Sequence, residues 1–126
     1  MTDGLAYDGA VTLAIGVRDR TASADWYADH LGFELLYDAP EIGWCAMSTP
    51  IPGVVFGFSD VEEPAPGGPV PTFDVRDHDA ARSRLESAGV RFDGPPIEHA
   101  GLARLSTFYD PDGHALMLAQ DLSGEG

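Results

Sequence analysis

Hydrophobic residues at alternate positions predict strands along much of this chain, and two stretches with helical spacing interrupt them. The first predicted strand covers residues 10–17. Its two faces differ, because bulky side chains occupy every second position and small ones stand between them. The bulky positions are Val11, Leu13, Ile15 and Val17, and the small ones are Thr12, Ala14 and Gly16. The small face should leave room beside the sheet.

A helix is predicted directly after this strand. Asp19 or Thr21 can cap its start, and Gly32 supplies the stop after His30 or Leu31. Apolar residues recur on one face of this helix at Ala24, Tyr27, Ala28 and Leu31. Further strands are predicted over residues 33–37, 43–48 and 54–58, with proline and glycine in the breaks between them.

The second half of the chain repeats this order. Residues 61–69 are rich in proline and glycine and are the natural linker between two modules, about residues 10–60 and 70–120. Val75-Arg76-Asp77 leads from a predicted strand into a helix, as Val17-Arg18-Asp19 does in the first half. The second helix has its apolar stripe at Ala81, Leu85 and Ala88 and ends at Gly89. The strands of this half are expected over residues 70–75, 90–92, 102–109 and 114–120.

A sharp turn should join the last two of these strands. Asp110-Pro111-Asp112-Gly113 offers aspartate to start the turn, proline to set φ, and glycine where φ becomes positive. Each half is then strand, helix, strand, strand, strand. The pattern predicts one α+β domain over residues 1–126, in which two βαβββ modules form a curved mixed sheet around a cup and the helices lie outside.

The charge of the chain excludes several kinds of partner. There are 21 acidic and 7 basic residues, for a formal net charge of −14. Such a surface repels phosphate backbones and anionic lipids, so we expect neither nucleic acid nor a membrane as a partner. Met1-Thr2-Asp3-Gly4 lacks the basic start of a secretory signal, and we expect a cytoplasmic protein. The acidity suits a cationic ligand, and it also serves solubility.

Isolated reactive side chains have ordinary structural interpretations. The single cysteine, Cys45, excludes an intramolecular disulfide framework and is interpreted as a buried spectator. His30 lies at a helix end and His78 at a helix start, where solvent-exposed capping roles are expected. His114 directly follows the turn glycine.

These motifs together resemble the vicinal oxygen chelate superfamily, which includes glyoxalase I, extradiol dioxygenases, fosfomycin-resistance enzymes and bleomycin-resistance proteins. The resemblance covers about residues 11–120. It is carried by Val17-Arg18-Asp19, Asp25-Trp26-Tyr27-Ala28-Asp29-His30-Leu31-Gly32-Phe33, Val75-Arg76-Asp77 and Phe108-Tyr109-Asp110-Pro111-Asp112-Gly113-His114. The resemblance implies paired modules around a cup, a metal in that cup in the metal-dependent members, and a homodimer.

Metal-dependent relatives hold their ion with four side chains, usually His, Gln or Glu. The resemblance puts the corresponding positions at Thr12, Val70 and Met117 and in residues 54–58, a stretch without any donor. Hard or borderline divalent cations prefer imidazole and carboxylate ligands. We therefore expect no metal site and no cofactor in this chain.

What remains is a cup that can bind a small molecule. Strand alternation places small and polar side chains on its concave face, at Thr12, Ala14, Gly16, Val70, Thr72, Asp74, Ala115, Met117 and Ala119. Aromatic walls are available from Trp44, Phe56, Phe58, Phe108 and Tyr109, which are equally compatible with a plain core. Arg104 can orient an anionic group of the ligand and Asp74 a cationic one, and either can equally point to solvent.

Three functions follow from these candidates. The leading one is a metal-free protein that binds a small molecule, cationic or aromatic, in the cup. The alternative is a lyase, isomerase or transferase whose acid and base groups are His99, Glu98, Tyr109 or Asp74. His99, in the predicted loop of residues 95–101, is the histidine expected near the rim of the cup, with Glu98 beside it. The third is metal catalysis with unusual ligands.

Overall fold

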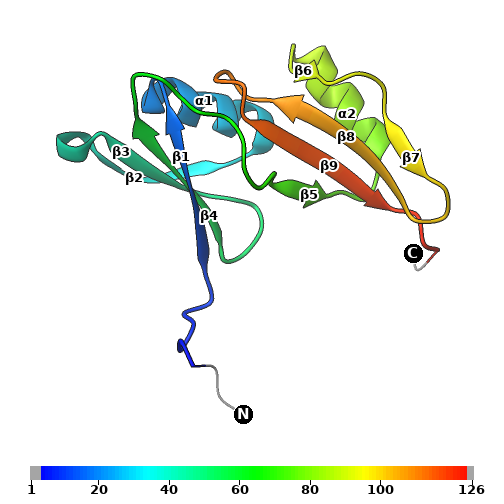
Figure 1. Ribbon diagram of the computed structural model, residues 1–126, viewed down its shortest axis with the longest axis horizontal. Coiled ribbons are helices and arrows are strands. Elements are labelled where there is room, and N and C mark those ends of the chain that lie inside the picture. The colour runs from blue at the N-terminus through cyan, green and yellow to red at the C-terminus, as the bar shows by residue number, and fades with distance from the viewer. Residues whose placement is uncertain (1–3, 125–126) are drawn as a thin grey trace. The chain divides into compact units, whose positions relative to one another are not determined.

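The computed structural model describes residues 4–124, so the start of the chain, from which the sequence predicts no secretory signal, lies outside the described part. The chain divides into two compact units, one ending at Pro64 and the other starting at Ala65. This boundary falls inside the predicted linker, residues 61–69. Each unit has its own sheet and its own α-helix (Figure 1).

The first unit follows the predicted order of strand, helix, strand, strand, strand. Its elements are β1 (Val11–Val17), α1 (Arg20–Leu31), β2 (Glu34–Ala39), a 3-10 turn η1 (Pro40–Ile42), β3 (Trp44–Ser48) and β4 (Val54–Asp60). The strands form a sheet in the order β1-β4-β3-β2, in which β1 runs parallel to β4 and the other neighbours are antiparallel.

Helix α1 starts and ends as its sequence predicts. The Asp19 carboxylate accepts hydrogen bonds from the backbone amides of Thr21 and Ala22, at 3.0 and 3.2 Å, and Gly32 closes the helix with a φ of 76°. Tyr27 packs among the aromatic side chains of the unit, with ring centroids 4.8 to 5.6 Å from those of Phe33, Phe56 and Phe58. Ala28 is exposed, because α1 buries Ser23, Ala24 and Tyr27 instead.

The second unit adds one strand to the predicted order. Its elements are β5 (Thr72–Asp74), α2 (His78–Ser87), β6 (Arg91–Phe92), β7 (Ile97–His99), β8 (Ala103–Tyr109) and β9 (Ala115–Asp121). The sheet order is β5-β9-β8-β6, and β7 also pairs with β8. Strand β5 is parallel to β9, and the other pairs are antiparallel.

Two strand predictions in this unit need correction. Strand β5 begins at Thr72 and not at residue 70, and Val70 lies outside it with 41% of its surface exposed. Residues 97–99, predicted as part of a loop, form β7, because Ile97, Glu98 and His99 pair with β8. A three-residue strand carries too little alternation to be recognised, and its conformation depends on the partner strand.

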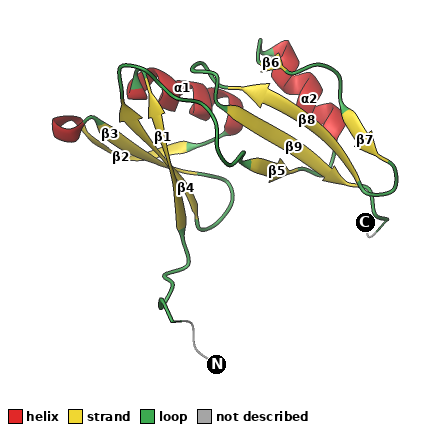
Figure 2. Cartoon of the chain, viewed as in Figure 1, coloured by secondary structure: helices red, strands yellow, loops and turns green. Residues whose placement is uncertain are grey.

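Helix α2 is capped by Asp77, whose carboxylate accepts from the backbone amide of Ala80 at 3.0 Å, and it is followed by Gly89 with a φ of 88°. Leu85 of the predicted stripe is buried, whereas Ala88, at the end of the helix, is exposed. The α+β class and the two βαβββ modules are thus confirmed, with one helix packed against each mixed sheet (Figure 2). Within residues 4–124, no helix has the length and hydropathy needed to span a membrane.

Candidate functional site

Each sheet has one face against its helix and an opposite face, called here its helix-free face. Residues that stand opposite one another in neighbouring strands share a face, and successive residues of a strand alternate between faces. In the first unit, Phe56 and Phe58 contact Tyr27 of α1, so Gly57 between them belongs to the helix-free face. In the second, Ser106 contacts Arg82 of α2, so Thr107 belongs to the helix-free face.

An aromatic pair occupies the helix-free face of the first sheet. The Trp44 indole covers Gly57: a Cβ placed on that glycine would lie only 2.0 Å from the ring carbon Cη2 of Trp44. The Trp44 indole N–H donates a hydrogen bond to the Tyr37 hydroxyl at 3.0 Å. Tyr37 stands in one row with Ala46 and Gly57 and is 53% exposed. This face therefore presents a hydrogen-bonded tryptophan and tyrosine, held over a glycine.

The sequence predicts Trp44 as an aromatic wall but gives no such role to Tyr37 or Gly57. A glycine inside a strand often marks the close approach of another group, and Gly57 stands between two phenylalanines in β4. A glycine between two phenylalanines could therefore have identified position 57 from the sequence as a place that another group approaches. Tyr37 reaches this face because the register of β2 shifts between Leu35 and Tyr37, a β-bulge that alternation alone does not reveal.

The other two candidates in the first unit lie on opposite faces. Thr12 is exposed on the helix-free face, opposite Val55. Phe56 is fully buried on the helix side, since it pairs with Leu13 of the bulky face of β1 and contacts Tyr27. A ligand on the helix-free face would not touch Phe56, which acts as core in this unit.

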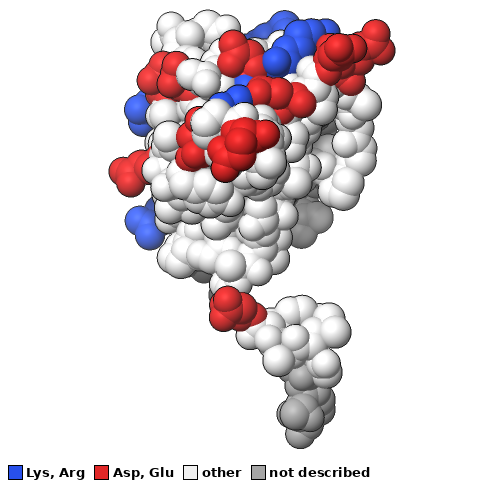
Figure 3. Space-filling view, turned by 90° about the vertical axis from the view of Figure 1, so that its left-hand side faces the viewer, with Lys and Arg blue, Asp and Glu red and all other residues white. Residues whose placement is uncertain are grey.

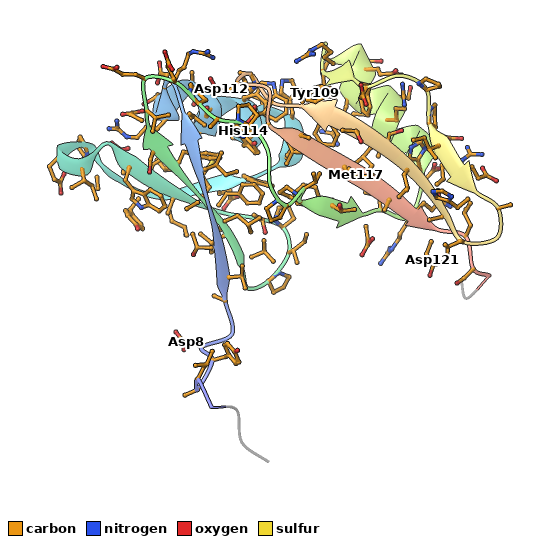
Figure 4. All side chains as sticks on the ribbon, viewed as in Figure 1. Asp8, Tyr109, Asp112, His114, Met117 and Asp121 are labelled. Atoms are coloured by element: carbon orange, nitrogen blue, oxygen red, sulfur yellow. The ribbon has the colours of Figure 1, made fainter. Side chains whose placement is uncertain are left out.

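In the second unit, three predicted ligand-binding residues lie on the helix-free face. Met117 of β9 stands opposite Thr72 and Thr107, and Asp74 is an exposed residue of β5, two positions after Thr72. Tyr109 lies on the same face at the end of β8 (Figure 4). The Arg91 guanidinium lies 4.6 Å from the centroid of the Tyr109 ring.

The Tyr109 hydroxyl stays protonated near neutral pH. Burial raises its pKa above the usual value of 10.0, and the nearby Asp93 carboxylate raises it further. The protonated hydroxyl donates a hydrogen bond to the Asp93 carboxylate, so Tyr109 is not suited to accept a proton as a general base.

Glu98 and Arg104 lie on the helix side, contrary to their expected place in the cup. Arg104 donates to Glu98 at 2.5 Å and to Asp79 of α2 at 2.8 Å, so its guanidinium already holds carboxylates of this unit. His99 follows Glu98 in β7 and therefore points to the other face. The structure does not bring His99 and Glu98 together as an acid/base pair.

A buried polar network under α2 was not predicted. His78 is fully buried rather than exposed. Its Nε2 lies 2.7 Å from Ser106 Oγ and its Nδ1 2.8 Å from Asp79 Oδ1, and Arg82 donates to Ser106 at 2.9 Å. Serine, histidine and aspartate in this order resemble a catalytic triad. Because Ser106 is only 3% exposed and points toward α2, the network is a connection between helix and sheet.

The donor set does not suit a divalent metal ion. Among residues 4–124, no three histidine, cysteine, aspartate or glutamate side chains gather in a way that could hold one. Thr12 and Met117 offer a hydroxyl and a thioether, and Val70 offers no donor at all. Asp60 at the end of β4 is bound by Arg20 at 2.5 Å. Imidazole and carboxylate ligands that a divalent ion prefers are thus missing at the implied positions.

Comparison with known proteins gives a consistent family match. The family model for the Glyoxalase/Bleomycin resistance protein/Dioxygenase superfamily matches residues 9–118. A member of this superfamily from Sphaerobacter thermophilus shares 27% identity with the chain and superposes with a TM-score of 0.77, covering 92% of this chain and 98% of that one. No curated protein sequence matches the chain significantly.

Two other solved structures are similar to this chain. TnmS3, described as an antibiotic binding protein from a Streptomyces species, shares 25% identity with a TM-score of 0.71, covering 92% of this chain and 98% of its own. The fosfomycin resistance protein FosX of Listeria monocytogenes, in complex with Mn(II) and sulfate, shares 16% identity with a TM-score of 0.74, covering 91% of each chain. At that identity the likeness to FosX concerns the fold alone.

Proposed function

Because the chain belongs to the glyoxalase/bleomycin resistance protein/dioxygenase superfamily, we propose that it binds a small planar molecule, aromatic or cationic, without a bound metal. The observation that carries this proposal is the aromatic pair of Trp44 and Tyr37 on the helix-free face of the first sheet. Ring stacking contributes about 0.5–1.5 kcal/mol beyond burial of apolar area. A cationic ring gains further from the negative face of an indole.

The charge of the protein supports a cationic ligand over an anionic one. With a net charge of −14, the potential around the molecule attracts cations and slows the approach of anions. Acidic side chains gather with arginines over the upper part of the face shown in Figure 3. The relative described as an antibiotic binding protein, which shares 25% identity over most of both chains, supports a role in binding rather than turnover.

Two tryptophans in the chain allow a matched test. Trp44→Leu removes the stacking surface, whereas Trp26→Leu removes an indole on α1 that contacts Tyr27 and His30. Binding of ethidium, proflavine and neutral anthraquinones is measured by calorimetry with EDTA present. We expect at least one planar compound to bind, with affinity about tenfold lower in Trp44→Leu and unchanged in Trp26→Leu.

Three results would contradict this proposal. They are binding that disappears with EDTA and returns with a divalent metal, equal losses in both variants, and no binding of any planar compound. Binding that depends on a divalent metal would favour a metal-dependent function. The second would move the site away from Trp44, and the third would leave the binding function without support.

The alternative is an enzyme that uses acid and base groups without a metal. Its candidates on the helix-free face of the second sheet are Tyr109 and Asp74. Arg104 holds Glu98 in an ion pair, and His99, the next residue in β7, lies on the opposite face of the sheet from Glu98. Product analysis on any bound compound tests this alternative: turnover that disappears in His99→Ala or Tyr109→Phe would favour it.

We also propose a cytoplasmic homodimer. The expectation of a dimer rests on the resemblance to the superfamily, and that of a cytoplasmic location on the sequence. Light scattering at several concentrations would measure the first, and fractionation of cells that express the protein the second.

A further inference from the structure

The indole of Trp44 is held at both ends. Its six-membered ring lies so close to the Gly57 backbone that a Cβ on that glycine would fall 2.0 Å from Cη2, and its N–H donates to the Tyr37 hydroxyl at 3.0 Å. Ala46, which stands opposite both Tyr37 and Gly57, is only 3% exposed, so side chains of the helix-free face cover it. The ring is therefore in place before a ligand arrives, and a ligand can stack on it without moving it.

The direction of the hydrogen bond between Trp44 and Tyr37 decides what Tyr37 can offer a ligand. An indole nitrogen only donates, so the Tyr37 oxygen is the acceptor in this pair and its own proton is not used. Among residues 4–124, this is the one hydrogen bond found for the hydroxyl, and Tyr37 is 53% exposed. The proton of Tyr37 is therefore available to an acceptor that comes from outside the protein.

The Tyr37 hydroxyl lies at the edge of the stacking surface. A ring packed on the indole lies about 3.5–4 Å from it. Because the Tyr37 oxygen is 3.0 Å from Nε1 of Trp44, an oxygen on the edge of the stacked ring can come within hydrogen-bond reach of the hydroxyl.

Two facts restrict the chemistry of the group that Tyr37 meets. The net charge of −14 opposes a carboxylate or a phosphate, so the acceptor should be neutral. A donor on the ligand suits this place less well, since the indole N–H already occupies the Tyr37 oxygen. A carbonyl oxygen meets both conditions.

We propose that Tyr37 donates a hydrogen bond to the ligand, and that the ligand is a planar ring system with a carbonyl oxygen on its edge, stacked on Trp44. This inference rests on the function proposed above and names the ligand class. Tyr37 then determines specificity, since Trp44 accepts any planar ring, whereas the hydroxyl distinguishes rings by the group on their edge. One neutral hydrogen bond of this kind changes affinity by about two- to tenfold.

Two probes that differ at one ring position test this hydrogen bond. 2-(Aminomethyl)-9-fluorenone carries a carbonyl where 2-(aminomethyl)fluorene carries a methylene group, and the two share their fused rings and their positive charge. In calorimetry, we expect wild-type protein to bind the ketone about fivefold more tightly than the hydrocarbon. This ratio should fall to about one in Tyr37→Phe. It should stay at about five in Tyr7→Phe, the matched change at an exposed tyrosine that precedes β1.

Trp44→Phe shows which of the two side chains bonds to the carbonyl. This variant keeps an aromatic ring and removes the indole N–H, so both probes should bind more weakly while the ketone stays preferred. Loss of the preference in Trp44→Phe together with its retention in Tyr37→Phe would assign the bond to the indole and overturn the proposal. A circular dichroism spectrum like that of wild type shows that each variant is folded.

Equal affinity of wild-type protein for the two probes would also overturn the proposal. These outcomes differ from a failure of the proposed function. If both probes bind equally well, and both bind more weakly to Trp44→Leu, the aromatic site stands and the role of Tyr37 is wrong. If neither probe binds to wild-type protein, the proposed function fails and the role of Tyr37 fails with it.

Discussion

At the scale of single residues, His78 is fully buried and held by hydrogen bonds. Both ring nitrogens have partners, Ser106 and Asp79, and its backbone amide donates to the Gln120 side chain at 2.7 Å. Ser106 Oγ accepts a hydrogen bond from Arg82, so the hydroxyl proton of Ser106 can be donated to Nε2 of His78. The ring proton of His78 then lies on Nδ1 and points to the Asp79 carboxylate. The residue thus joins the start of α2 to β8 and β9.

Replacement of this histidine should measure the strength of that connection. In His78→Leu, Ser106 keeps only the bond from Arg82 and Asp79 keeps only Arg104, so we expect a loss of about 1–3 kcal/mol in the free energy of unfolding. Urea denaturation followed by circular dichroism measures it. His99→Leu, at an exposed position of β7, is the control and should stay within about 0.5 kcal/mol of wild type. Equal losses in both variants would contradict the argument.

Individual site residues could be predicted only in part. Trp44 is predicted as an aromatic wall, and its indole lies on the helix-free face over Gly57. The sequence leaves Phe56 compatible with either a wall or the core, because its burial depends on its pairing with Leu13 and on the position of α1. The role of Arg104 depends on Glu98 of β7, six residues before it, and on Asp79 of α2, 25 residues before it, which it meets only in the folded unit.

At the scale of secondary-structure elements, Arg104 connects two strands and a helix of the second unit. It lies in β8 and binds Glu98 of β7 and Asp79 of α2. Hydrogen bonds from His78 and then Arg104 lower the pKa of Asp79 below its usual 3.8. The carboxylate is therefore charged above that pH, and its stabilising contribution is lost only as the pH falls through the lower value of the folded state.

Loss of this connection should release the edge strand. Arg104→Gln removes both ion pairs, and we expect faster hydrogen exchange of the β7 amides at pH 7, because β7 otherwise pairs with β8 alone. Arg84→Gln, an exposed arginine on α2, serves as the matched control and should leave β7 unchanged. Unchanged protection of β7 in Arg104→Gln would show that the backbone pairing holds the strand without the ion pairs.

Sequence motifs predicted those elements whose ends are fixed by residues close to them in the chain. Asp19 and Asp77 cap the two helices, glycines end them, and the turn at Asp110 is held by its own carboxylate, which accepts from the amides of Asp112 and His114 at 2.9 Å. Strand β7 escaped prediction because its conformation is imposed by β8. Fold class was thus readable from the sequence, whereas the partners of each side chain were not.

At the scale of the whole molecule, the excess of acidic residues should make stability depend on salt. Arg20, Arg82 and Arg104 are engaged in ion pairs, and the chain carries 21 acidic residues against seven arginines. Most of this charge lies at the surface, where like charges repel and salt screens the repulsion over about 10 Å at 0.1 M.

We therefore expect Tm to rise as sodium chloride increases from 10 to 500 mM, because the screening length falls from about 30 Å to about 4 Å. The expected gain is on the order of 1 kcal/mol, or about 3–5 °C at this chain length. Calorimetry measures it, and potassium chloride should give the same curve, since screening depends on ionic strength and not on the cation. A falling Tm would show that ion pairs such as Arg20 with Asp38 outweigh the repulsion.

The bulge in β2 has a consequence for how this protein can change during evolution. Leu36 is an extra residue between Leu35, which stands opposite Met47, and Tyr37, which stands opposite Ala46. The sheet absorbs it without moving its neighbours to the other face. A deletion of the Leu36 codon would shorten the strand and still leave Tyr37 opposite Ala46, so descendants can gain or lose a residue here and keep the same side chains on the helix-free face.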